Sequence, residues 1–421
     1  MKYSSYADHQ LKISDIIIAM LVLINSGYAL TSGSYTLLFL LLATLTVALL
    51  LKEGLCLRIP RKDSKLIVLL IMAVSMAISF LVNWEFSVFK VYIHTALFIV
   101  NGYLIRLVYT GRQVVNTFIR VLQIAAIGAI LVAVVDMVIP INSFAPIVVN
   151  GSGKEYYTLG IVSYQTETYR SGKRCCGLFW EPGMFSGMLA LATMLDLYTR
   201  RDEKQFWRIV TYCTAIFITF STSGYVYYIM IGLMIMVRNK KRGRSAIALL
   251  IIAGAVVIFS SLIQDTISAL FELLPLVFDK VKTKNLSYRT RVLSPFADVM
   301  LMLKYPFGTG FEDFLEIRTS LMSQMGAKTS ITTSTLTYFG VTSGILFFVA
   351  YNASWIKGFL TARQVIPLKI FAIMLYALVL TSNPMFNNQM IWIITFMNFS
   401  GLGESEGSVL GNRRLPKVRL R

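Results

Sequence analysis

Long apolar runs separated by short polar segments follow one another along most of the chain. A helix needs about 20 apolar residues, within a range of about 17 to 25, to cross the hydrocarbon core of a membrane. The stretches 207–237 and 369–400 exceed one crossing and are interrupted at Ser221-Thr222-Ser223-Gly224 and Asn383-Pro384, so we divide each into two. The pattern predicts an all-α polytopic integral membrane protein of about twelve transmembrane helices, near residues 14–31, 35–51, 66–83, 88–108, 115–139, 182–199, 207–220, 223–237, 245–263, 333–353, 369–384 and 386–400.

Composition and charge support this class and add an orientation. Of the 421 residues, 56% are hydrophobic and only 14% are charged, against roughly 25% charged in an average soluble domain. This excludes an ordinary soluble enzyme, a disordered chain and a disulfide scaffold. The net charge is +19, and most basic residues fall in segments on one side of the predicted spans, which the positive-inside rule assigns to the cytoplasm. Both termini are then cytoplasmic, and the basic tail 401–421 is a membrane-side anchor rather than a nucleic-acid-binding segment.

Two long loops, 140–181 and 264–332, fall on the outer side of a single transmembrane domain that covers residues 1–421. Long loops in a compact protein are usually functional or disordered. Residues 264–280 carry apolar side chains at helical spacing, which predicts an amphipathic helix. It either lies flat on the outer membrane surface or packs on the bundle.

The first loop ends in a cluster of charged residues just before a span. Arg170 and Arg174 precede Glu181-Pro182. Proline fits the first turn of a helix, so Glu181 is expected beside the helix N-terminus, where a carboxylate is stabilised. Glu181 is either a base at the bilayer surface or only a cap. The nearby Ser223, in the break at 221–224, either satisfies freed backbone groups or binds a ligand.

The second loop holds a basic cluster over residues 280–291, which includes Lys284, Tyr288, Arg289 and Arg291. Arginine binds phosphate through two hydrogen bonds, so one interpretation of this cluster is a phosphate-binding site. The alternative is a surface patch that is attracted to anionic lipid headgroups. Neither a D-x-D motif nor a His/Cys metal-ligand pattern occurs, so we predict no metal and no cofactor. The four cysteines form no C-x-x-C pair and are interpreted as structural.

Three local patterns together carry a family resemblance. They are Arg174 followed by Phe179, Glu181-Pro182 and Phe185, then Phe220-Ser221-Thr222-Ser223-Gly224, then Arg291 followed by Pro306, Gly308 and Gly310. In this order, in a chain of this size and span number, the sequence resembles the bacterial polysaccharide polymerase and O-antigen ligase superfamily. The patterns cover roughly residues 174–310, and the other spans match the family only in topology.

The resemblance implies a lipid-carrier glycosyltransferase of the GT-C type in the bacterial inner membrane. Its donor would be an oligosaccharide on undecaprenyl diphosphate, used on the periplasmic side to build lipopolysaccharide O-antigen, capsule or exopolysaccharide. Chain-length regulators, flippases and membrane lipids are the implied partners, and no nucleic acid is expected. Ligases of the superfamily use a histidine in the large outer loop. Here His9 lies in the N-terminal tail and His94 inside a span, which favours a polymerase over a ligase.

The resulting hypothesis assigns roles to named residues. Arg291 and Arg174, helped by Arg289, grip the diphosphate, and Glu181 accepts the proton of the attacking hydroxyl, with inversion and without a metal. Arg170, Tyr288, Ser223 and Lys284 complete the substrate-binding set. A lipid-linked oligosaccharide flippase is the alternative from another class. Transporters usually place ionisable groups at mid-membrane, and the few candidates here lie mostly near span ends, which favours the transferase.

Overall fold

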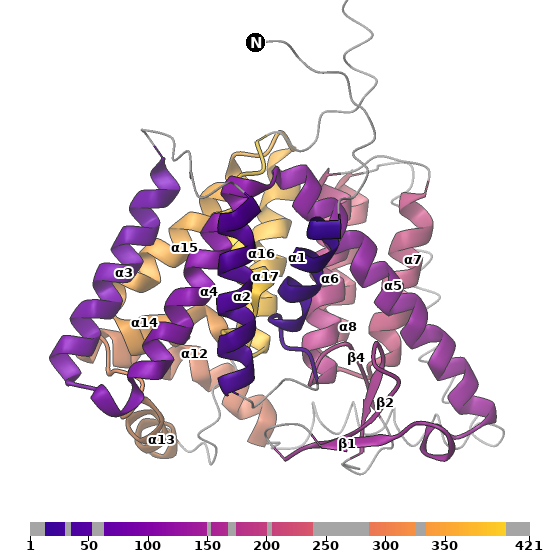
Figure 1. The fold of residues 1–421 in the computed structure, drawn as a ribbon, viewed down its shortest axis with the longest axis horizontal. Helices are drawn as coiled ribbons and strands as arrows, with labels where there is room; N and C mark the ends of the chain where they lie inside the picture. The colour runs from indigo at the N-terminus through magenta and orange to yellow at the C-terminus, as the bar shows by residue number, and fades with distance from the viewer. Residues whose placement is uncertain are drawn as a thin grey trace, which may run out of the picture.

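The computed structural model describes residues 13–29, 35–52, 63–149, 153–166, 174–199, 204–238, 286–325 and 334–400, and these are mostly helical (Figure 1). Long helices run up and down between the two ends of a bundle, and a small β-sheet lies at the lower end in Figure 1, which we call the sheet end. The α-helices are α1 (Ile13–Ile24), α2 (Tyr35–Lys52), α3 (Ser64–Asn83), α4 (Phe89–Val108), α5 (Gly111–Val138), α6 (Pro182–Thr199), α7 (Gln205–Ile218), α8 (Thr222–Arg238), α12 (Leu286–Lys304), α13 (Phe314–Gln324), α14 (Thr335–Ser343), α15 (Ile345–Leu360), α16 (Ile366–Ser382) and α17 (Gln389–Phe396).

Three helical segments are long and apolar enough to cross a membrane: Ser64–Asn83, Phe86–Val108 and Gly111–Val138. Five shorter apolar helices accompany them within the described ranges. These helices indicate a membrane protein, as the hydrophobic pattern predicts. The number of twelve spans stays a prediction, and the expected span at 245–263 lies outside the described residues.

Both predicted breaks in the long apolar stretches are confirmed. Helix α7 ends at Ile218 before α8 begins at Thr222, and α16 ends at Ser382 before the short α17. The expected helix over 333–353 is instead divided at Gly344, whose φ is +95°. A Cβ at Gly344 would lie 2.8 Å from the Pro306 carbonyl oxygen, so only glycine allows this approach. The Phe339 and Phe347 rings stack across the break with centroids 5.2 Å apart, so α14 and α15 pack against each other.

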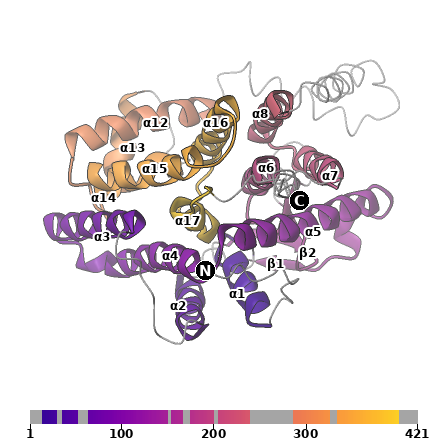
Figure 2. The same cartoon turned by 90° about the horizontal axis from the view of Figure 1, so that it is seen from above.

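Helix α6 is almost wholly enclosed by the bundle. Every residue from Pro182 to Tyr198 is buried, and α5, α7, α8 and α16 pack around the helix. Viewed from above, α6 lies among α5, α7, α8 and α16 (Figure 2). A helix that is apolar all round is expected at such an interior position.

The predicted loop 140–181 contains a four-stranded antiparallel sheet, so the all-α prediction is wrong for this segment. Strands β1 (Ile147–Val149), β2 (Glu155–Thr158), β3 (Ser163–Gln165) and β4 (Arg174–Gly177) pair in sequence order. The chain after α1 holds the sheet to the bundle, because the Ala29 amide donates to the Leu178 carbonyl at 3.0 Å. Strands of three or four residues are too short to show an alternating pattern, which explains why the sequence does not reveal them.

The predicted loop 264–332 contains α12 and α13, which pack together and against α14. A buried ion pair joins α12 to α13, with Arg318 Nε 2.8 Å from Asp298 Oδ1. The Thr337 hydroxyl of α14 donates to the other oxygen of the Asp298 carboxylate at 2.6 Å. The amphipathic helix expected over 264–280 and the basic tail 401–421 lie outside the described residues.

Candidate functional site

Arg174 begins β4 and connects the sheet to the turn between α7 and α8. Its half-buried guanidinium donates from Nη2 to the carbonyl oxygen of Phe220 at 3.0 Å. Phe220 has a φ of +48°, a left-handed conformation that is uncommon for a bulky residue. The unusual turn therefore presents its carbonyl to the arginine.

Glu181 lies between β4 and the first turn of α6, as the Glu-Pro pattern predicts. Its backbone carbonyl accepts hydrogen bonds from the amides of Met184 and Phe185, each at 3.1 Å. The half-buried side chain stands at a helix N-terminus, where the helix dipole stabilises a carboxylate. No side chain or amide in the described ranges donates a hydrogen bond to this carboxylate.

Arg174 and Glu181 both act on the buried thiol of Cys176. Burial raises the pKa of the Cys176 thiol well above its ordinary value, and the neighbouring Cys175 adds to this. Arg174 opposes the increase in pKa, and Glu181 adds to it. A cation and an anion from the two sides of one short segment therefore act on the same buried group.

The small-residue break at the start of α8 is buried directly after Phe220. The Ser221 and Ser223 hydroxyls lie 2.9 Å apart and bond to each other, and the Ser221 amide donates to Thr219 Oγ1 at 3.3 Å. The Thr219 hydroxyl thus satisfies the Ser221 amide, whereas the Ser223 hydroxyl, for which a backbone or a ligand partner is expected, bonds to the Ser221 hydroxyl. Ser223 is placed beside the first turn of α6.

Asn383 completes this buried polar cluster, and sequence analysis does not identify it as a site residue. Gly183, in the first turn of α6, lies so close that a Cβ on it would be 2.8 Å from Asn383 Oδ1 and within 4 Å of both serine hydroxyls. The side-chain amide of Asn383 donates to the Tyr227 hydroxyl at 2.7 Å. The backbone carbonyl of Asn383 accepts a hydrogen bond from Thr335 Oγ1, also at 2.7 Å. The only sequence signal is the Asn383-Pro384 pair, which we interpret there as a helix break.

The ends of α6, α8, α14 and α16 therefore meet in one buried polar cluster, which adjoins Phe220, the partner of Arg174, and the Glu181-Pro182 start of α6. The arrangement provides a guanidinium that can bind an anion, a carboxylate that can take a proton, and hydroxyl and amide groups that can orient a polar ligand. The cluster lies at the sheet end of the bundle (Figure 1).

The other predicted site residues are placed only in part. Tyr288, Arg289 and Arg291 lie on α12, of which the backbone alone is described at these positions. Helix α12 packs against α14 and α16, the two helices that meet at Asn383. Arg170 and Lys284 lie outside the described residues. The structure thus brings Arg174, Glu181 and Ser223 to one region and does not test the remaining five.

The Pro306-x-Gly308-x-Gly310 turn is a docking element rather than part of this polar cluster. Gly308 and Gly310 have φ values of +95° and +76°. The Thr309 and Gly310 amides donate to the carbonyls of Val341 and Thr342 at 2.8 and 3.1 Å. The turn therefore fixes the end of α12 against α14.

Glu85, which the sequence analysis did not single out, holds the same turn from the α3–α4 side. This carboxylate is only 3% exposed. It accepts hydrogen bonds from the Phe311 and Glu312 amides, both at 2.8 Å, and from the Tyr92 hydroxyl at 2.7 Å. A buried carboxylate with three donors is a strong local constraint.

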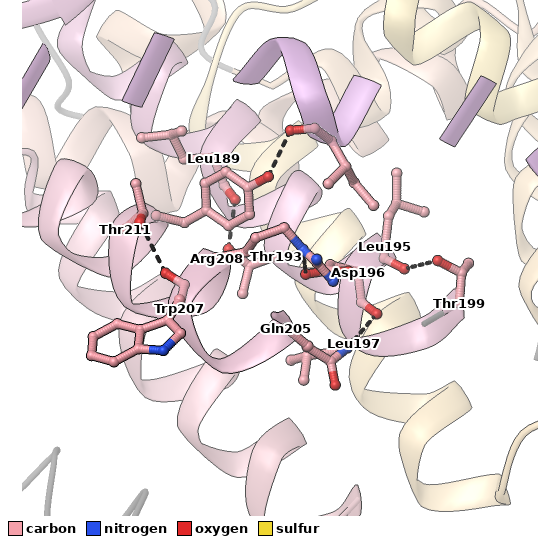
Figure 3. A network of polar contacts seen from close by, with 12 residues as sticks. Leu189, Thr193, Leu195, Asp196, Leu197, Thr199, Gln205, Trp207, Arg208 and Thr211 are labelled. Carbon is pink, nitrogen blue, oxygen red and sulfur yellow. Dashed lines mark hydrogen bonds and ion pairs between the residues drawn. The ribbon is translucent and has the colours of Figure 1, made fainter. Parts of the chain in front are cut away.

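A second charged network lies at the opposite end of α6 (Figure 3). Arg208 of α7 donates to both carboxylate oxygens of Asp196, each at 2.9 Å, and Gln205 donates to the Asp196 carbonyl at 2.7 Å. Both charged side chains are buried, so this pair ties α6 to α7. Among the described residues, no group of three or more His, Cys, Asp or Glu side chains is placed to hold a metal ion.

Comparison with known proteins adds no family to these observations: no protein-family model and no curated protein matches the sequence.

Proposed function

We propose that this protein is a membrane-embedded glycosyltransferase of the polysaccharide polymerase type. It would transfer a growing glycan from undecaprenyl diphosphate to a sugar hydroxyl of another lipid-linked repeat unit. The observation that carries the proposal is that Arg174 bonds to the Phe220 carbonyl, whose neighbour Ser221 lies beside Gly183, two residues after Glu181. The proposal includes the bacterial inner membrane, cytoplasmic termini and a periplasmic site.

The chemistry follows from the charges. The acceptor oxygen attacks the anomeric carbon, and the bond from that carbon to the diphosphate oxygen breaks. Undecaprenyl diphosphate leaves with the electron pair, and the hydroxyl proton passes to Glu181. Arg174, with Arg291 and Arg289 of α12, stabilises the charge that grows on the leaving diphosphate. Arg170, Tyr288, Ser223 and Lys284 bind the remainder of the substrate.

The alternatives are an O-antigen ligase that uses lipid A–core as acceptor, and a flippase that moves the lipid-linked oligosaccharide without chemistry. Two pairs of described charges support the transferase over the flippase. Asp196 bonds to Arg208, and Asp63 bonds to Arg106 at 2.7 Å. Charges that stabilise the fold in this way are poorly suited to follow a moving substrate.

The test uses purified protein in detergent with lipid-linked repeat units, and reads the product masses. A ladder of longer glycans supports the polymerase. Product formed only when lipid A–core is added indicates a ligase, and unchanged substrate in both reactions indicates transport.

Variants then test the residues. Losing one electrostatic contact to the leaving group costs roughly 10²–10³ in rate, so Arg174→Ala and Glu181→Gln should lose the ladder. Arg174→Lys should fail nearly as badly, because a point charge cannot replace the guanidinium fork. The matched controls are Arg363→Ala and Glu316→Gln, which change exposed residues outside the site and should retain full activity. Normal chain growth by Glu181→Gln would overturn its role as the base.

A further inference from the structure

The hairpin that joins β2 to β3 has an apolar tip, residues 158–163, with the sequence Thr-Leu-Gly-Ile-Val-Ser. Leu159 is 42% exposed and Ile161 is 52% exposed. Val162 points the other way and is buried. Two large apolar side chains at the tip of a loop need a partner or a non-aqueous surrounding.

The tip packs beside the middle of α5 rather than beyond its end. A Cβ on Gly128 would lie 3.3 Å from Val162 Cγ2 and 3.5 Å from Ile161 Cδ1. Gly128 shares a helix face with Ile124 and Leu131, at spacings of four and three residues, and these two side chains are 62% and 60% exposed. The exposed apolar surface of the tip therefore continues the exposed apolar stripe of α5. The two views agree that the strands lie next to the sheet-end half of α5 (Figures 1 and 2).

The length of α5 fixes the depth of this contact. Helix α5 has 28 residues, about 42 Å at 1.5 Å per residue, whereas the hydrocarbon core is about 30 Å thick. At most about 12 Å of the helix can lie outside the core when it spans a bilayer. Gly128 is about 15 Å from the sheet end of α5, so it lies inside the core even if the whole excess is placed at that end.

Helix α5 carries polar residues toward both ends. Arg112, Asn116 and Arg120 lie in its first three turns, and Asp136 lies in its last turn, before Met137 and Val138, which are 76% and 81% exposed. Polar residues favour the water interface, and they reach further along the helix from its first end. Most of the excess therefore lies at that end, and the tip contact at Gly128 stays inside the core.

The backbone of the tip is suited to an environment without water. The Leu159 amide donates to the Val162 carbonyl at 2.9 Å, and the Ile161 amide donates to the Leu159 carbonyl at 3.1 Å. Thr158 Oγ1 accepts from the Gly160 amide at 3.1 Å, and the Tyr28 hydroxyl donates to the Gly160 carbonyl at 2.8 Å. Unsatisfied backbone groups are costly at membrane depth, where non-helical backbone must be covered by protein, so these four hydrogen bonds and the contact with α5 lower the cost of placing the tip there.

We propose that the tip of the β2–β3 hairpin is inserted in the hydrocarbon core of the bilayer, where Leu159 and Ile161 contact lipid chains. Part of the segment expected as an outer loop thus enters the membrane between α5 and the segment after α1 that carries Tyr28. The proposal does not depend on the glycosyltransferase activity.

The test places one nitroxide label at a time on the full-length chain, with its native cysteines replaced by alanine, in phosphatidylcholine–phosphatidylglycerol vesicles. The labels replace Ile161 through Ile161→Cys and, as the matched control, Glu155 through Glu155→Cys. Glu155 is an exposed residue in the same hairpin, about 13 Å from the tip by the rise of a strand. Continuous-wave electron paramagnetic resonance then compares collisions with oxygen, which concentrates in hydrocarbon, and with a water-soluble nickel chelate.

We expect the label at residue 161 to collide mainly with oxygen and the label at residue 155 mainly with the chelate, with an oxygen-to-chelate ratio at least several-fold higher at 161. Equal ratios would overturn the proposal, because the tip would then be in water. Low collision rates with both reagents at residue 161 would also overturn it, because another protein surface would then cover the tip. Leu159→Cys provides a second tip position if the Ile161 variant does not fold.

Discussion

Replacing Gly310 by alanine tests the contact between the Pro306–Gly310 turn and the buried carboxylate of Glu85. A Cβ at this position would overlap the Glu85 carboxyl group. The φ of +76° also disfavours any side chain, at a cost of roughly 1–2 kcal/mol. The carboxylate would have to give up at least one of its three hydrogen bonds, each worth about 1.5–3 kcal/mol for a charged acceptor. We therefore expect Gly310→Ala to lower the free energy of unfolding by about 3–5 kcal/mol.

The chain offers a matched control for the backbone cost alone. Gly153 has a φ of +77°, and a Cβ there would meet no atom within 4 Å. Gly153→Ala should therefore cost only about 1–2 kcal/mol. Titration with SDS in mixed micelles measures the free energy of unfolding of each variant.

A double-mutant cycle separates the two contributions further. In a Glu85→Ala background the carboxyl group is gone, so Gly310→Ala should cost little more than its backbone term. The coupling energy between the two positions should be about 2–3 kcal/mol. An equal cost of Gly310→Ala in both backgrounds, or a cost no larger than that of Gly153→Ala, would refute the claim that the turn is built around this carboxylate.

Three further predictions concern the ends of α6 and the sheet. Gly183→Ala should destabilise the protein by about 1–3 kcal/mol through overpacking against Asn383, measured by the same SDS titration, and an unchanged midpoint would contradict the close approach. Arg208→Ala should cost about 3–5 kcal/mol, because it leaves Asp196 buried without its ion-pair partner, and Asp196→Ala combined with Arg208→Ala should cost less than that single change. Burial raises the pKa of the Cys175 thiol from 9.0 to about 11, so between these pH values the unfolded chain loses a proton that the folded chain keeps, and stability falls as pH rises. Cys175→Ala should flatten this part of the stability profile relative to the wild-type protein, and identical profiles would contradict the assignment.

The hydrophobic pattern predicts helices well where proline, glycine or a run of small polar residues marks the helix ends. Helix α6 begins at Pro182, as the Glu-Pro pair indicates, and the breaks at 221–224 and at Asn383-Pro384 separate helices in the structure. Glycine and proline act locally, so their effect on the backbone can be deduced from the chain itself. The break at Gly344 depends on contact with Pro306, about 40 residues away, and no local pattern reveals it.

The candidate site was predictable only where its residues belong to short local patterns, such as the break at 221–224 that contains Ser223. Arg174 and Glu181 lie in one short segment, so a single motif exposes both. Asn383 and Thr335 join the cluster because α14 and α16 fold back onto α6, and their polarity alone does not indicate this. Glu85 is missed for the same reason, since its donors at Phe311 and Glu312 come from a distant turn.

The enclosure of α6 has a consequence for how the chain is assembled. A helix whose sides all contact protein gains nothing from lipid, and it carries a buried Asp196 that requires Arg208 of the next helix. A nascent chain that ends near residue 204 would expose this carboxylate, and the α8 and α16 faces of the helix would lack their partners. The final position of α6 therefore depends on helices that are synthesised after it, and it is reached only once α16 has been made.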